Sequence, residues 1–385
     1  MRYGDSVSLR DAPRAQARVH RRPVVVWNTT RRCNLHCVHC YASAQDVEFE
    51  GELTTQEGKA LIDDLASYGV PVLLFSGGEP LMRHDLFEMV AYASSKGLRA
   101  VLSTNGTLIT PEAAAKLKAA GTHYVGVSID GVEATNDRFR GKKGAFRMAL
   151  QGLRNARAAG LKTGLRFTLT RYNVGDLEAI LDMAEKETAR LCIYHLVYAG
   201  RAAKQAQRVD LTASEAREAM NLLFQKAQAY HDGGLPMEVL TVDNHADGPY
   251  LYLHAREHQP ERADEILALL KRNGGNSSGV GIGAVSSLGD VHPDQFWRHY
   301  SPGNVRQRPF SQIWEDTSDP VMAGLKDRRA RLTGRCASCR FLDVCNGNFR
   351  VRAEAVYGDL WAPDPACYLT DDEVGVPSAA KSWSI

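Results

Sequence analysis

Short runs of β-branched and aromatic residues alternate with amphipathic stretches between residues 23 and 200. This alternation is typical of βα units, in which each strand of a parallel sheet is followed by a helix that covers the sheet. The expected strands are residues 23–28, 72–75, 99–103, 124–128, 162–169 and 191–197, and the expected helices are residues 55–68, 84–96, 111–120, 145–159 and 176–188. Six strands are too few for a closed eight-stranded barrel. We therefore expect an α/β fold with an open, partial (β/α)6 barrel.

The pattern changes after residue 200, where longer helical stretches replace the alternation. One helix is expected at 212–231, and one or two at 247–273 with a break at Pro260. A glycine- and serine-rich stretch, a short hairpin and a helix at 311–327 follow. The expected division is a loose N-terminal arm at 1–22, a barrel at 23–210, a helical and hairpin bridging region at 211–310, and a cysteine-rich domain with a tail at 311–385.

The charge and hydropathy of the chain exclude several functional classes. Its 385 residues include 47 lysines and arginines against 45 aspartates and glutamates, a net charge of +2, whereas a general nucleic-acid-binding protein has a basic excess. The first 22 residues lack the apolar core of a signal peptide. The only early apolar run, residues 24–27, is far shorter than the roughly 20 residues of a membrane span. We therefore expect a cytoplasmic protein that binds neither nucleic acid nor membrane.

The eight cysteines are unevenly distributed, with three at 33–40, four at 336–367 and Cys192 alone. Residues 33–40 read CNLHCVHC, directly after the first expected strand. Three thiolates so close together can share one metal centre. Zinc would need a fourth ligand, such as His36 or His39, whereas a 4Fe–4S cluster held by three cysteines keeps one iron open for a small molecule. Reactive thiols in two clusters also indicate a reducing compartment.

Polar, glycine-containing turns follow the next three expected strands. They read SGGEP at 76–80, STNG at 103–106 and SIDG at 128–131. The C-terminal ends of parallel strands meet at one rim, where barrel-like α/β folds gather their site residues. Glycines let the backbone approach a ligand closely, and a carboxylate can accept a hydrogen bond from an ammonium group. These turns and the cysteine loop therefore predict one ligand site at this rim.

The C-x3-C-x2-C loop, followed by GGEP about forty residues later, resembles the radical S-adenosylmethionine (SAM) enzymes. In that family the three cysteines, matched here by Cys33, Cys37 and Cys40, bind a 4Fe–4S cluster. SAM chelates the free iron of this cluster through its amino and carboxyl groups. The resemblance implies reductive cleavage of SAM to a 5′-deoxyadenosyl radical, with electrons from a donor such as flavodoxin or ferredoxin. It also implies cofactor contacts from Gly77, Gly78, Glu79, Ser103, Asn105, Ser128, Asp130 and Arg140. The sequence departs from the family at His39, where an aromatic residue usually precedes the last cysteine.

The second cysteine cluster has the spacing C-x2-C-x5-C-x21-C at Cys336, Cys339, Cys345 and Cys367. Four thiolates can complete the coordination of a structural zinc ion or of an iron–sulfur cluster. This C-terminal spacing resembles the auxiliary-cluster domains of radical SAM enzymes, called SPASM or twitch domains. The resemblance implies a second 4Fe–4S cluster, fully ligated by these four cysteines. Cys192 lies in an expected strand and is interpreted as a packing residue.

Longer strings, among them TVDNHADGPYLYL, NGGNSSGVGIG and DVHPDQFW, resemble the radical SAM enzymes of heme d1 biosynthesis. The resemblance implies that the substrate is the tetrapyrrole 12,18-didecarboxysiroheme, and that the propionates of rings A and B are removed and oxygen functions introduced. Two alternatives remain open. One is a related enzyme of the alternative heme pathway, which forms iron-coproporphyrin from the same substrate. The other is a peptide-maturing radical SAM enzyme.

A flat polycarboxylate substrate requires cationic and hydrogen-bonding side chains in its pocket. The candidates are Arg166, Arg201, His245 and His292. Arg166 is the strongest of them, because an arginine on a barrel strand is unfavourable to bury without an anionic partner.

Overall fold

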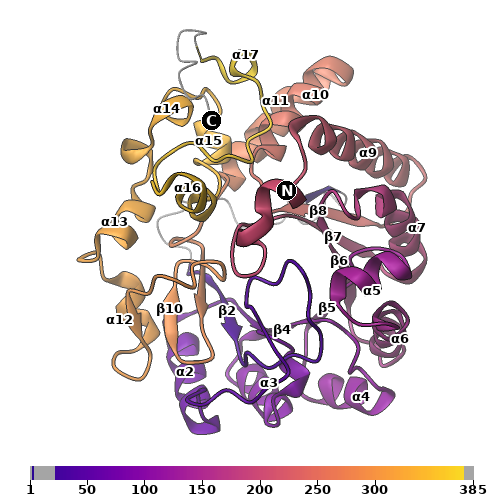
Figure 1. The fold of residues 1–385 in the computed structure, drawn as a ribbon, viewed down its shortest axis with the longest axis vertical. Helices are drawn as coiled ribbons and strands as arrows, with labels where there is room; N and C mark the ends of the chain where they lie inside the picture. The colour runs from indigo at the N-terminus through magenta and orange to yellow at the C-terminus, as the bar shows by residue number, and fades with distance from the viewer. Residues whose placement is uncertain (1, 4–21, 377–385) are drawn as a thin grey trace.

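The computed structural model describes residues 2–3 and 22–376, and at its centre is one sheet of eleven strands (Figure 1). The six expected strands are all present and lie next to one another in sequence order. They are β2 (Val24–Asn28), β3 (Val72–Ser76), β4 (Arg99–Thr104), β5 (Tyr124–Ser128), β6 (Thr163–Leu169) and β7 (Arg190–His195). Each of them pairs in parallel with the next. The α/β class is therefore confirmed.

The sheet is wider than the sequence predicts, because two more parallel strands flank the expected six. β8 (Glu238–Val242) pairs with β7, and β9 (Ile282–Val285) pairs with β2. Antiparallel strands complete the two edges, and these are β1 (Arg2–Tyr3) beside β8, and β10 (Asp290–His292) and β11 (Gly303–Asn304) beyond β9. Four strands of the region expected to bridge the domains, β8 to β11, therefore belong to the central sheet. Residues 4–21 of the expected arm lie outside the described residues.

Helices form an arc around the outer side of the strands (Figure 1). The helices up to residue 232 are α2 (Thr55–Tyr68), α3 (Leu86–Ser95), α4 (Pro111–Ala119), α5 (Ala134–Arg140), α6 (Ala145–Ala158), α7 (Leu177–Glu187), α8 (Ala206–Val209) and α9 (Ala213–Asp232). Short 3-10 helices lie at Pro80–Met82, Val174–Asp176, Ala203–Gln205 and Arg329–Arg331. Local sequence sets the bounds of α2, which begins at a capping box of Thr54 and Glu57 and ends at Gly69.

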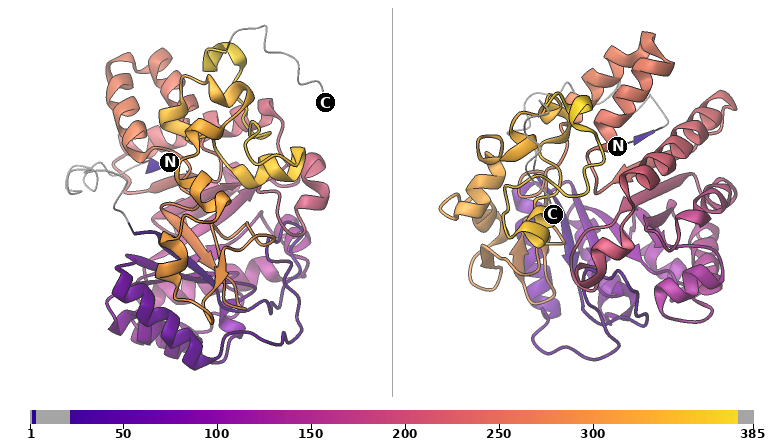
Figure 2. Two further views of the ribbon diagram at one scale, coloured as in Figure 1. Left: turned by 90° about the vertical axis from the view of Figure 1, so that its left-hand side faces the viewer. Right: turned by 45° about the horizontal axis from the view of Figure 1, so that its top comes forward.

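The rest of the described chain is mostly helical (Figure 2). α10 (Asp247–His258) and α11 (Pro260–Asn273) lie beside α9, and α12 (Phe310–Glu315) and α13 (Pro320–Lys326) lie on the side of the sheet that carries β10 (Figure 1). The remaining helices are α14 (Gly334–Ala337), α15 (Leu342–Cys345), α16 (Arg350–Tyr357) and α17 (Asp371–Val374). The expected break at Pro260 is confirmed. None of the described helices is both long enough and apolar enough to span a membrane.

The prediction of a single helix at 311–327 is wrong. Helix α12 ends at Glu315, and a second helix, α13, begins at Pro320. Asp319 has an extended backbone, which the proline after it favours, and its carboxylate accepts hydrogen bonds from the first amides of α13. A helix stop and a new helix start therefore fall inside one amphipathic stretch.

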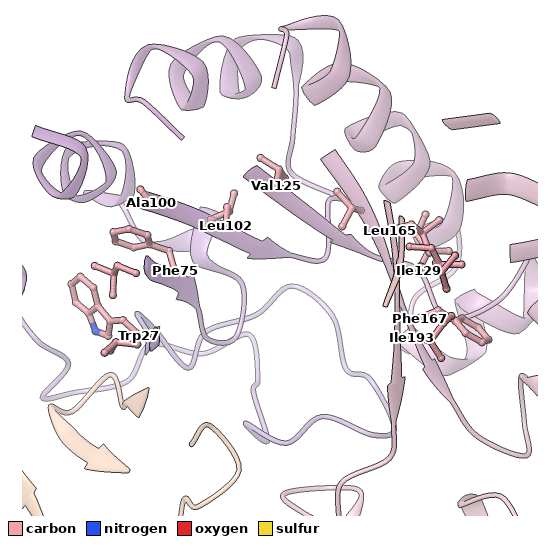
Figure 3. Close-up of a cluster of buried hydrophobic side chains, with 14 of the residues drawn as sticks. Trp27, Phe75, Ala100, Leu102, Val125, Ile129, Leu165, Phe167 and Ile193 are labelled. Atoms are coloured by element: carbon pink, nitrogen blue, oxygen red, sulfur yellow. The ribbon is translucent and has the colours of Figure 1, made fainter. Parts of the chain in front are cut away.

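The hydrophobic core lies between the sheet and its outer helices, where Figure 3 shows a cluster of buried side chains. Phe75 of β3, Leu102 of β4, and Leu165 and Phe167 of β6 belong to it, and all four are fully buried. Side chains alternate between the two faces of a strand. Arg166, between two core residues of β6, therefore lies on the opposite, inner face of the sheet.

Phe75 allows a direct test of this core. Replacing Phe75 with alanine removes a fully buried ring and leaves a cavity, which lowers the free energy of unfolding by about 3–5 kcal/mol. Tyr172→Ala is the matched control, because Tyr172 is 51% exposed and its loss changes that free energy by no more than about 0.5 kcal/mol. Anaerobic urea unfolding measures both variants, and equal midpoints would contradict the assigned core.

Candidate active site

The inner face of the sheet opens into a cavity at the C-terminal ends of the strands. Its volume, including open solvent at the mouth, is about 1130 Å³. Strands β3 to β7 contribute side chains to it, and so does the cysteine loop between β2 and α2. The predicted site residues that line it are Cys33, Cys37, Cys40, Gly77, Gly78, Ser103, Asn105, Ser128, Arg140, Arg166 and Arg201. The structure thus brings these residues, far apart in the sequence, to one place.

Hydrogen bonds to other segments hold the cysteine loop in position. The amides of His36 and Val38 donate to carbonyl oxygens at the end of α5, at 3.1 and 3.0 Å. Arg201 donates from Nε to the carbonyl oxygen of Cys37 (2.7 Å) and from Nη1 to that of Ala44 (2.8 Å). Arg201 therefore lines the cavity, but it uses two nitrogens to hold the loop. Its Nη2 is buried without a hydrogen-bond partner among the described residues.

Two of the three thiols of the loop have N–H donors close to sulfur. The amide of Leu35 and Nδ2 of Asn105 lie 3.5 and 3.8 Å from Sγ of Cys33. Arg140 Nη1 lies 3.7 Å from Sγ of Cys37. Burial raises the pKa of the Cys33 thiol to about 12 and also raises that of Cys37, so these thiols are protonated without a metal, and metal binding would displace their protons. Hydrogen bonds to sulfur are typical of iron–sulfur sites, and the donor set fits a 4Fe–4S cluster held by the three cysteines.

The zinc alternative requires side chains that converge on one ion. Among the residues that the structure describes, no group of three or more His, Cys, Asp or Glu side chains could hold a single metal ion. A 4Fe–4S cluster makes a different demand, because each thiolate binds a different iron atom. His39 packs on Phe139, with ring centroids 4.5 Å apart, and its Nε2 lies 3.4 Å from Asp130. Burial lowers the pKa of His39 to about 4, so the ring is neutral and takes the place of the family's aromatic residue.

The GGEP turn packs directly on the backbone of the cysteine loop. A Cβ atom on Gly77 would lie 2.4 Å from a carbonyl oxygen of the loop, and one on Gly78 would lie 2.2 Å from another. Glu79 is fully buried and does not line the cavity. Its carboxylate accepts hydrogen bonds from the Thr104 hydroxyl (2.7 Å) and the Asn105 amide (2.8 Å), and burial raises its pKa to about 7. Glu79 therefore lies behind the cavity wall and holds the next turn.

Asp130 has a similar position behind the wall. It is fully buried and outside the lining. Arg140 Nη2 lies 2.5 Å from Asp130 Oδ2, and the Thr168 amide donates to Oδ1 at 2.7 Å. Arg140 thus connects a buried carboxylate to the cavity and to the Cys37 thiol.

Arg166 is a cation of the inner wall without a carboxylate partner. It lines the cavity, and it forms no ion pair with any described residue. Nη1 donates a hydrogen bond to the hydroxyl of Ser103. A Cβ atom on Gly126 would lie 2.2 Å from Nε of Arg166, so the glycine leaves the space that the guanidinium occupies. Arg166 is half-buried, and a cation in this situation suits an anionic ligand.

His245 and His292 do not line this cavity. The amide of His245 donates to Oδ1 of Asn348 at 2.8 Å, and its ring packs on Phe349. Nδ1 of His292 lies 2.7 Å from the carbonyl oxygen of Tyr300. The structure therefore does not bring these two predicted substrate residues to the others.

Other cavity residues are not indicated by the sequence patterns, and they include Tyr194, His195, Asp243, Gln295 and Phe296. Asp243 directly follows β8 and has a φ of +67°, a left-handed conformation that is uncommon outside glycine. It is 8% exposed, and its carboxyl group has no hydrogen bond or ion pair with the part of the chain that the structure describes. Burial raises the pKa of Asp243 to about 7. The rule that strand ends carry site residues would have identified it, had residues 238–242 been recognised as a strand.

The four C-terminal cysteines surround a second, smaller hollow. Its lining includes Cys336, Cys339, Cys345 and Cys367. Burial raises the pKa of all four thiols, and the Phe341 amide lies 3.4 Å from Sγ of Cys339. The glycine-rich stretch packs here, since a Cβ atom on Gly275 would lie 2.1 Å from the carbonyl oxygen of Cys345. Four thiols around one hollow are the donor set of a fully ligated centre.

The fold and the three-cysteine loop define the class of protein. A family model described as the Radical SAM superfamily matches residues 27–184. The chain also aligns along most of its length with two relatives of assigned function. It belongs to the radical SAM superfamily.

The names of these two relatives refer to particular tetrapyrrole products. The chain is 60% identical over 379 residues to an Fe-coproporphyrin III synthase of Methanosarcina barkeri, covering 97% of this chain and 95% of the relative. It is 44% identical over 357 residues to a pre-heme d1 synthase of Dinoroseobacter shibae, covering 92% and 88%. The solved structure of anSMEcpe with bound AdoMet has the same fold, with a TM-score of 0.69 at 18% identity over 89% of this chain and 93% of that one.

The buried acid of the cavity has a measurable effect on stability. Asp243 has a pKa of about 7 in the folded chain, against an ordinary value of 3.8 for aspartate, so folding takes up a proton between these pH values and stability falls as pH rises through 7. Asp243→Asn removes the buried charge and suits the left-handed backbone. At pH 8 we expect the variant to be more stable than the wild type by a few kcal/mol, at about 1.4 kcal/mol per pKa unit. The difference should vanish near pH 4 in thermal unfolding, and a constant difference at all pH values would contradict the assignment.

Proposed function

We propose that this radical SAM enzyme converts 12,18-didecarboxysiroheme to Fe-coproporphyrin III in the alternative heme pathway. The observation that carries the proposal is the 60% identity, along almost the whole chain, to an Fe-coproporphyrin III synthase. The identity to a pre-heme d1 synthase is 44%. The expectation of a heme d1 enzyme therefore becomes the second candidate, and the alternative heme pathway takes its place as the first.

Five residues around the cysteine loop have specific roles in this proposal. Cys33, Cys37 and Cys40 would hold a 4Fe–4S cluster, which when bound supplies the electron that cleaves SAM to a 5′-deoxyadenosyl radical. Arg140 keeps a positive charge beside these thiolates, 3.7 Å from Sγ of Cys37. Arg201 and the end of α5 fix the loop, so that the thiols remain at the cavity wall.

The composition of the cavity suits a large, flat and anionic substrate. Val26, Leu74, Val197 and Phe296 give it apolar walls, which suit the faces of a macrocycle. Arg166 supplies a guanidinium without a carboxylate partner among the described residues, which suits a side-chain carboxylate of the substrate.

The four C-terminal cysteines hold a second 4Fe–4S cluster in this proposal. All of its irons would be ligated by protein, so its role is electron transfer or structural support rather than substrate chelation. A flavodoxin or ferredoxin would supply electrons. The observation that supports the second cluster is the position of four thiols around one hollow.

Product analysis separates the candidate reactions. Anaerobic turnover with SAM, a reductant and 12,18-didecarboxysiroheme should give a product with the mass of Fe-coproporphyrin III. Cys37→Ala should abolish turnover and SAM cleavage, whereas Tyr172→Ala, which changes an exposed side chain that lines neither cavity, should leave both in place. A product that has lost two propionates would support the heme d1 reaction, and an unchanged tetrapyrrole would count against both.

Iron analysis tests the second cluster. The reconstituted wild type should contain about eight iron atoms per chain, as two 4Fe–4S clusters require. The double variant Cys336→Ala/Cys339→Ala should fall to about four and still cleave SAM, because the first cluster is intact. Cys192→Ala is the control with unchanged iron. An iron content that does not fall in the double variant would rule out these cysteines as ligands.

A further inference from the structure

Two charged groups of the cavity, Arg166 of β6 and Asp243 after β8, form no ion pair with any described residue. Arg166 is half-buried and Asp243 is buried. Two other pairs nearby are formed within the protein: His195 Nε2 lies 3.1 Å from Asp247, and Arg352 lies 2.9 Å from Asp364. In the part of the chain that the structure describes, Arg166 and Asp243 therefore remain available to a ligand.

The sheet register sets the distance between the two groups. Arg166 lies opposite Cys192 of β7, and the pairing of β7 with β8 places Val242 opposite Tyr194. Asp243 follows Val242, so along the strands it lies about three residues, or roughly 10 Å, beyond Arg166, and the two strand spacings from β6 to β8 add roughly 10 Å across the sheet. Tyr194 lies between them, with its ring centroid 6.0 Å from the guanidinium carbon of Arg166. One carboxylate does not span this gap, but a macrocycle with several peripheral carboxylates does.

We propose that Arg166 and Asp243 bind two different carboxylates of the tetrapyrrole, Arg166 as a cation and Asp243 as a neutral carboxylic acid that donates a hydrogen bond. The proposal rests on the proposed function and adds to it the groups that recognise the substrate. A carboxylate needs a donor, and an aspartate supplies one only in its protonated form. Burial of Asp243, which raises its pKa to about 7, supports that form.

The surroundings of Asp243 agree with a protonated acid. The titratable and charged groups that act on it or on its neighbours in this wall are Cys192, Tyr194, His195, Arg166, Arg352, Asp294 and the N-terminal amino group. Arg352, His195 and the N-terminal amino group favour the ionised form, Asp294 opposes it, and burial outweighs them. Arg352 is already paired with Asp364 and His195 with Asp247, so neither is free to neutralise Asp243.

Binding of ferric Fe-coproporphyrin III at two pH values tests this subsite. Because one proton must be bound at a pKa of about 7, the wild type should bind about tenfold more weakly at pH 8 than at pH 6. Asp243→Asn should lose this ratio, since the amide donates a hydrogen bond at both pH values. Arg166→Met should weaken binding at both pH values by a similar factor and keep the ratio. Asp182→Asn makes the same chemical change at a half-exposed site and should behave as the wild type.

The outcomes separate the subsite from the proposed function. A wild-type affinity that does not change with pH, or an Asp243→Asn ratio equal to that of the wild type, would overturn the role of Asp243. Unchanged affinity in Arg166→Met would overturn that of Arg166. No binding of the tetrapyrrole by wild-type holoenzyme that binds SAM would instead count against the proposed function. If a variant fails to bind SAM, and so has not folded, the pH ratio of the wild type alone still decides the case.

Discussion

The active site depends on the close approach of backbone to backbone around the cysteine loop. Four glycines from three other segments touch this loop, and a Cβ atom on any of them would lie within 2.6 Å of one of its carbonyl oxygens. They are Gly77 and Gly78 after β3, Gly141 after α5 and Gly200 after β7. Real Cβ atoms do not approach that closely, so a larger side chain at any of these positions would displace the loop. The loop has no regular secondary structure of its own, and these contacts, with Arg201, fix where its three thiols lie.

The parallel sheet then divides the remaining side chains between core and cavity. Alternate residues of each strand face the outer helices, and the residues between them face the inner side. The strand ends carry carboxylates, but the structure uses two of them internally: Glu79 holds the β4 turn and Asp130 pairs with Arg140. Both are fully buried. These acids position the groups of the wall, and it is their neighbours Asn105 and Arg140 that line the cavity.

Much of this arrangement could be predicted from sequence, because strong local patterns specify it. Strand β5 and helix α2 have the expected bounds, since β-branched runs and a capping box mark them. β9 and β10 form the expected short hairpin, but the pairing of β9 with β2, which is distant in sequence, was not predicted. β8 was not predicted, because it lies between the helices α9 and α10, outside the βα alternation, and Asp243 at its end was therefore missed. For His245 and His292, local chemistry suggested a ligand role, whereas tertiary packing places them against Asn348 and Tyr300 outside the cavity.

The net charge of the whole chain does not describe the charged groups inside the cavity. A net charge of +2 excludes a broad basic surface but says little about single buried groups. Burying a charge is unfavourable unless a partner compensates it, and the internal pairs Arg140–Asp130 and Arg352–Asp364 satisfy this requirement. Arg166 has no such partner among the described residues, whereas Asp243, in the same cavity, meets the requirement in another way, because burial raises its pKa to about 7 and favours the neutral acid. In the proposal above, a polyanionic substrate supplies the missing partner of Arg166 and accepts a hydrogen bond from Asp243.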